Sequence, residues 1–152
     1  MNVAGWGNLV EGVAVIREVS QAYTCKEQRA ALTVVNDGHA PIAFVRLDGG
    51  FFPEGNACDF AVSSCQAPFA GFILELKGCH ADHAVVQLST TLQRLKTGRG
   101  QFICRSAVVV SSGTKMPGHL WQKLVRTFRS RHGMRLERCS NRERVGFSRY
   151  GA

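Results

Sequence analysis

The sequence is short of acidic residues and of long apolar runs, and each shortage excludes a class of protein. It contains 11 Asp and Glu residues against 19 Lys and Arg, which gives a formal net charge of +8. No apolar run approaches the roughly 20 residues that a membrane-spanning helix needs. Residues 1–19 lack the basic start of a signal peptide. We therefore expect a cytoplasmic protein that has no membrane partner.

Closely paired cysteines are also missing. None of the six cysteines forms a Cys-x-x-Cys pair, and their spacing is irregular. Zinc ribbons and small disulfide scaffolds need close, regular spacing, so both classes are disfavoured and the thiols are expected to be reduced. The length of 152 residues predicts a single domain over residues 1–140, followed by a basic, polar and mobile tail at residues 141–152.

Positive charge is concentrated in the last part of the chain. Residues 118–152 hold nine Lys and Arg but only two acidic residues, a net of +7 out of the +8 of the chain. Such a segment attracts polyanions, and arginine binds phosphate through two hydrogen bonds. The expected phosphate contacts are Arg126, Arg129, Arg131 and Arg135. The alternative is a solvated basic segment that maintains solubility or binds another protein.

Hydrophobic spacing predicts alternating strands and helices. Helices are expected over residues 8–20, 81–96 and 118–131, because apolar residues recur there at helical spacing. Strands are expected over 31–35, 41–47, 58–62, 72–77, 102–110 and 134–138, with residues 36–39 joining the first two as a turn. This order predicts the α/β class, with a central mixed sheet between helices in an α/β/α sandwich.

Three charged residues interrupt the apolar strands in the middle of the chain. Asp59 begins one predicted strand, and Glu75 and Lys77 lie in the next. Side chains alternate along a strand, so Glu75 and Lys77 share one face, and a hairpin across residues 63–71 brings Asp59 to the same patch. Carboxylate oxygens suit Mg²⁺ or Mn²⁺, and an ammonium group stabilises charge that develops on a phosphoryl group.

This pattern resembles the PD-(D/E)xK nucleases, which have the restriction-endonuclease-like fold. Asp59 is followed by 15 residues and then by Glu75-Leu76-Lys77, with apolar residues around both halves. Cys58 stands where the family name has Pro. The resemblance implies an αβββαβ core, metal binding by Asp59, Glu75 and the Leu76 backbone carbonyl, and a catalytic Lys77.

The resemblance implies further site residues with less support from the motif. Members with an extra metal ligand carry a Glu on the first helix, for which Glu18 is the first choice and Glu11 and Glu27 are rivals. Gln87 matches a supporting Gln on the helix after the Lys strand. Asp48, which ends the preceding strand, is a supporting candidate from its own position in the chain, although Asp is also common in turns.

Together these features predict a nuclease dependent on Mg²⁺ or Mn²⁺. It would hydrolyse phosphodiester bonds with low sequence specificity, in defence, repair or mobile-element biology, with DNA favoured over RNA. The alternative from another class is a catalytically inactive nucleic-acid-binding or assembly module of the same fold. The sequence leaves open whether the active unit is a monomer, a homodimer or a complex with a partner protein.

Overall fold

The computed structural model of the chain describes residues 2–77, 81–97, 101–111 and 116–152. The described strands are β1 (Asn2–Val3), β2 (Gly7–Asn8), β3 (Ala14–Arg17), β4 (Ala22–Glu27), β5 (Ala30–Val35), β6 (Ile42–Arg46), β7 (Phe60–Ser64), β8 (Ala70–Lys77), β9 (Ile103–Ser111), β10 (Arg135–Ser140) and β11 (Glu143–Gly146). The described helices are α1 (Ala81–Thr97), α2 (Gly118–His132) and α3 (Ser148–Gly151). The prediction of the α/β class is confirmed.

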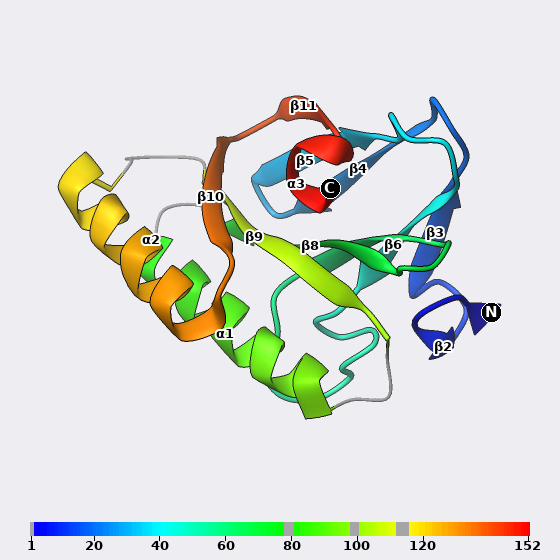
Figure 1. Cartoon of the computed structure of the whole chain (residues 1–152), viewed down its shortest axis with the longest axis horizontal. Coiled ribbons are helices and arrows are strands. Elements are labelled where there is room, and N and C mark those ends of the chain that lie inside the picture. Colours follow the sequence, from blue (N-terminus) through cyan, green and yellow to red (C-terminus); the bar gives the residue numbers. More distant parts are fainter. Residues whose placement is uncertain (1, 78–80, 98–100, 112–115) are drawn as a thin grey trace.

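A six-stranded mixed sheet forms the centre of the molecule, in the order β10-β9-β8-β7-β6-β3. Neighbouring strands from β3 to β8 are antiparallel, whereas β8, β9 and β10 are parallel to one another. Parallel neighbours need a crossover connection, and α1 and α2 provide the two crossovers. Both helices lie on the same face of this sheet (Figure 1).

Side-chain alternation along the central strands divides the core into two clusters. Ile73 and Val109 face α1 and α2, where they belong to the same buried cluster as Leu88 of α1. Their neighbours Leu74 and Val108 belong to the cluster on the opposite face. Both faces of β8 and β9 are therefore covered, which explains why these strands are apolar almost throughout.

The opposite face is covered by a second sheet, not by a layer of long helices as an α/β/α sandwich requires. This sheet has three strands in the order β11-β5-β4, and the short helix α3 lies beside it (Figure 1). Leu32 and Val34 of β5 alternate inward and are fully buried. The expected α/β/α layering is corrected accordingly, because β5 contributes its buried face to this second layer.

Residues 141–152, expected as a polar tail, are folded onto the rest of the molecule. They form β11, which pairs in parallel with β5, and α3. Val145 and Tyr150 are buried in the cluster that includes Leu32. Ser148 also donates hydrogen bonds to the carboxylate of Asp37. Strand pairing, two buried side chains and these hydrogen bonds therefore dock the segment.

The predicted helix over residues 8–20 is wrong. The structure has strand β2, a turn and strand β3 in this region, and Gly7 and Gly12 adopt positive φ angles of 76° and 87°. Backbone of this kind is incompatible with an α-helix. The apolar residues that recur at helical spacing therefore do not line one face of a helix. Leu9 is buried, whereas Ile16 is 38% exposed.

The predicted hairpin of residues 31–35 and 41–47 is also wrong, because β5 and β6 belong to different sheets. Asn36 begins the connection between them and is fully buried. Its side-chain Nδ2 donates to the carbonyls of Arg17 and Ala40, at 3.1 and 2.8 Å. The Asn-Asp-Gly segment is therefore a crossover between sheets that Asn36 fixes by hydrogen bonds.

Two broader expectations concern the membrane and the thiols. Among the described helices, none is both long enough and apolar enough to cross a membrane. The five cysteines in the described part of the chain are free thiols, and Cys25, Cys58 and Cys139 are buried. Cys79 lies outside the described residues.

Candidate active site

A polar cavity of about 250 Å³ opens where β6 and β8 end and β7 begins, beside the turn between β4 and β5. Its lining contains four carboxylates, two side-chain amides and an arginine from separate segments of the chain. The lining residues are Glu27, Gln28, Arg29, Asp48, Ala57, Asp59, Glu75, Leu76 and Gln87. We call this cavity the carboxylate pocket.

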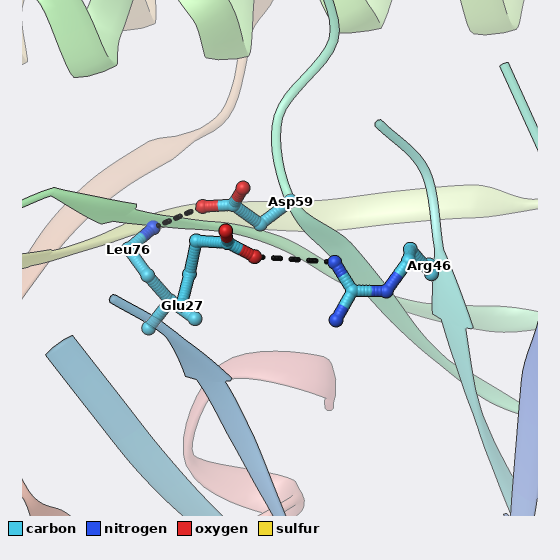
Figure 2. Close-up of polar contacts among 4 residues, drawn as sticks. All are labelled: Glu27, Arg46, Asp59 and Leu76. Carbon is cyan, nitrogen blue, oxygen red and sulfur yellow. Dashed lines mark hydrogen bonds and ion pairs between the residues drawn. The ribbon is translucent and has the colours of Figure 1, made fainter. Parts of the chain in front are cut away.

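Asp59 and Glu75 form the buried part of the carboxylate pocket. Strands β7 and β8 are antiparallel, with Phe60 opposite Leu74, and the next position of this register places Asp59 opposite Glu75. Asp59 is 8% exposed and Glu75 is 3% exposed. The Leu76 backbone N–H donates to Asp59 Oδ2 at 2.8 Å (Figure 2). The predicted convergence of the two carboxylates is thus present.

The backbone on both sides of Asp59 is held in place by hydrogen bonds. The Asp59 carbonyl accepts from the Leu47 N–H at 2.9 Å. The Cys58 N–H donates to Thr91 Oγ1 of α1 at 2.7 Å, and this hydroxyl donates to the Gln87 carbonyl at 2.8 Å. Thr91 is fully buried, so it joins α1 to the strand start at one defined position. This linkage fixes Gln87 relative to Asp59.

Glu27 enters the carboxylate pocket from the end of β4, on the second sheet. Its Oε2 lies 3.2 Å from Nη1 of Arg46, beside Asp59 (Figure 2). The Arg46 guanidinium also stacks over the ring of Phe60, 4.7 Å from its centroid. This ion pair therefore bridges the two sheets at the rim of the pocket and holds the Glu27 side chain there.

Burial raises the pKa of Asp59 above its usual value. The side-chain hydrogen bond with Glu75 and the Leu76 N–H lower this pKa without cancelling the effect of burial, and the negative charges of Glu27 and Asp48 raise it further. A raised pKa means that the ionised form is disfavoured in the folded protein. The pocket is therefore an unfavourable place for two carboxylates unless a proton or a cation is bound.

The titration of Asp59 leads to a testable dependence of stability on pH. Because its folded-state pKa is raised, Asp59 contributes fully to stability below its unfolded pKa of about 3.9, and this contribution is lost as the pH rises through the folded pKa. Urea unfolding in EDTA between about pH 4 and pH 7 measures the effect. Asp59→Asn should flatten this dependence relative to the unchanged protein; an Asp59→Asn variant with the same pH profile would contradict the assignment.

Only some of the site residues predicted from the sequence line the carboxylate pocket. Leu76, Gln87 and Asp48 line the carboxylate pocket, as does Glu27, the rival to Glu18. Glu18 is exposed in the turn between β3 and β4 and does not line it. Lys77 is the last residue of β8, and its side chain lies outside the described part of the structure.

The arginines predicted to contact phosphate lie away from the carboxylate pocket. Arg126, Arg129 and Arg131 are exposed on α2, and Arg131 lines a separate cavity between α1 and α2. Arg135 begins β10 and lies 3.8 Å from Glu137. None of the four lines the carboxylate pocket.

Gln28 and Arg29 were not predicted as site residues, although they form one wall of the carboxylate pocket. They occupy the two-residue turn between β4 and β5, and Gln28 has a positive φ of 50°. The alternation of residues 22–27 could have indicated β4 and hence a hairpin. The packing of this hairpin against the end of β8 depends on contacts between sheets, which have no local signal.

In the part of the chain that the structure describes, no group of three or more His, Cys, Asp or Glu side chains has the arrangement to hold a metal ion. Asp59 and Glu75 therefore stand as a pair, with Glu27 and Asp48 at the rim. Comparison of the chain with protein-family models, with curated proteins and with solved structures gave no match.

Proposed function

We propose that the protein is a metal-dependent nuclease of the PD-(D/E)xK type, which hydrolyses phosphodiester bonds in nucleic acid. The observation that carries this proposal is the pair of buried carboxylates, Asp59 and Glu75, facing each other across β7 and β8 in an open polar cavity. Isolated buried carboxylates are costly, so a site that keeps two of them beside a cavity suits a cationic ligand.

The chemistry of the donor set fits Mg²⁺ or Mn²⁺. Mg²⁺ is usually held by one or two protein carboxylates, and its other positions are filled by water and substrate phosphate. Asp59 and Glu75 would supply the carboxylates. The Leu76 backbone lies beside Asp59, to which its N–H donates, and its carbonyl is the proposed third ligand.

Each group of the site has a defined part in hydrolysis. A cation held by Asp59 and Glu75 would supply Lewis-acid charge at the phosphoryl group and would lower the pKa of water. Asp59 and Glu75 would supply the negative charge that balances the cation. Thr91 accepts a hydrogen bond from the Cys58 N–H and thereby fixes the backbone next to Asp59 relative to α1. Gln87 offers an amide at the pocket wall for orienting water or a phosphate oxygen. Lys77 is the proposed stabiliser of the developing phosphoryl charge.

The order of elements around the carboxylate pocket also supports the proposal. Strands β7 and β8, helix α1 and the parallel strand β9 follow one another as in the second half of the restriction-endonuclease-like core. The first helix of that core has no counterpart in residues 2–77, where the structure has strands and turns. Glu27 from β4 adds a carboxylate at the rim of the pocket, where it is paired with Arg46.

The proposal is tested by incubating the purified protein with linear, nicked and single-stranded DNA and with RNA. Each substrate is tested in Mg²⁺, in Mn²⁺ and in EDTA. We expect cleavage with Mg²⁺ or Mn²⁺, with DNA the favoured substrate, and none in EDTA. Tight binding without cleavage under every metal condition would overturn the nuclease proposal and support the non-catalytic nucleic-acid-binding module.

A further inference from the structure

A second cavity, of about 460 Å³, borders the carboxylate pocket on the far side of the turn between β4 and β5. Gln28 and Arg29 line both cavities, so this turn is their common wall. The second cavity is lined by Thr24, Lys26, Gln28, Arg29, Ala30, Ala31, Thr33 and Arg142. We call it the basic groove.

The basic groove and the carboxylate pocket have opposite charge. The lining of the groove includes Lys26, Arg29 and Arg142 and no acidic residue. All three basic side chains are exposed, and none forms an ion pair with another described residue. The hydroxyls of Thr24 and Thr33 lie 2.7 Å apart in the same cavity and add polar groups to its wall. The groove therefore offers three cations to an anionic ligand.

Arg142 reaches the basic groove because the chain is tied to the hairpin at this point. The Ala31 N–H donates to Asn141 Oδ1 at 2.8 Å, and Asn141 Nδ2 donates to the Arg29 carbonyl at 3.0 Å. The Arg142 N–H donates to the Ala31 carbonyl at 2.8 Å. These three bonds hold cations from distant parts of the sequence on one wall.

The backbone of the groove is strained at two positions. Gln28 and Arg142 have positive φ angles of 50° and 65°, and neither is a glycine. Side chains disfavour this left-handed region, so it persists where surrounding contacts impose it, and such positions are concentrated at binding sites. The hydrogen bonds to Ala31 and Arg29 provide that constraint for Arg142.

We infer that the basic groove binds the sugar–phosphate backbone of the nucleic acid next to the phosphate that occupies the carboxylate pocket. This inference rests on the proposed function for the identity of the ligand. The carboxylates repel a phosphate chain in the absence of metal, and the groove offers three cations on the other side of a single turn, which can bind the flanking phosphates. The phosphodiester is common to DNA and RNA, and both are included in the test.

The test measures binding separately from cleavage. Labelled single-stranded DNA, duplex DNA and single-stranded RNA are titrated by fluorescence anisotropy in EDTA over a series of salt concentrations. The variant Lys26→Ala/Arg29→Ala/Arg142→Ala is compared with Lys96→Ala/Arg105→Ala/Lys123→Ala, which removes the same charge from exposed positions that line neither cavity. Thermal unfolding verifies that both variants fold, and Arg142→Glu provides a second variant with one changed residue.

For the groove variant we expect roughly 30- to 100-fold weaker binding at 0.1 M salt, with a slope of log K against log salt that is smaller by about 2. This follows because each phosphate contact to a single strand contributes about 0.7 to the slope. The control should change both quantities much less. Equal binding by the two variants would overturn the inference, even if the protein cleaves nucleic acid. Weaker binding by the groove variant in a protein that never cleaves would support the groove and reject the nuclease.

Discussion

Replacing Glu75 by Gln is expected to lower metal-dependent cleavage by at least about 1,000-fold, which corresponds to a loss of about 4 kcal/mol of transition-state stabilisation. Gln has almost the same shape as Glu, so the packing around β8 is preserved, while a carboxylate is removed from the proposed cation site. Initial rates of oligonucleotide cleavage with Mg²⁺ or Mn²⁺ measure the effect.

The stability of the same variant separates a functional site from a structural one. Glu75 is 3% exposed, faces the buried Asp59 and forms a side-chain hydrogen bond with it, and the amide of Gln can donate that bond without a bound proton. We expect the unfolding midpoint of Glu75→Gln in EDTA to equal or exceed that of the unchanged protein. Glu54→Gln, at an exposed loop position, serves as the matched control and should cleave normally. Full activity in Glu75→Gln would reject the site.

A second large effect is expected from Gly71→Ala, at the start of β8. A Cβ atom at Gly71 would overlap the carbonyl of Val62 in β7, so the two strands would have to separate. A clash with backbone cannot be relieved by a side-chain rotation, and we expect a loss of about 3 kcal/mol of stability. For a chain of this size, that loss lowers the melting temperature by about 6–12 °C. Differential scanning calorimetry measures it.

The control for Gly71→Ala is the same substitution at the first residue of α2. A Cβ atom at Gly118 meets no atom within 4 Å, and this residue is helical. Since Ala forms helix better than Gly, Gly118→Ala should be neutral or stabilise by up to about 1 kcal/mol. A Gly71→Ala variant as stable as Gly118→Ala would show that β7 and β8 are not packed as closely as described, and the spacing of Asp59 and Glu75 would then need revision.

The predictable part of the site comes from local periodicity. Alternation along the strand puts Leu74 and Leu76 on the face opposite to Glu75, and in the structure both leucines belong to the buried cluster that the second sheet covers. The two long helices were also predicted within a few residues of their ends. Strong periodic segments behave in this way because burial of one face determines both their conformation and their orientation.

The remaining part depends on contacts between distant segments. The first segment was predicted as a helix because Leu9, Val13 and Ile16 have helical spacing, but Gly12 adopts a conformation that ends any helix there. The position of Glu27 beside Asp59 results from the packing of one sheet on another. No local pattern encodes such packing, and so Glu18 was preferred to Glu27.

The pairing of β11 with β5 has a consequence for the order in which the site is assembled. An isolated two-stranded hairpin is only marginally stable, and the third strand of this sheet comes from residues 143–146. The hairpin carries Glu27 and Arg29 into the carboxylate pocket. During synthesis, Asp59 and Glu75 can therefore meet well before the wall opposite them is fixed. The newly made protein would complete this wall of the carboxylate pocket last, after β7 and β8 have already paired.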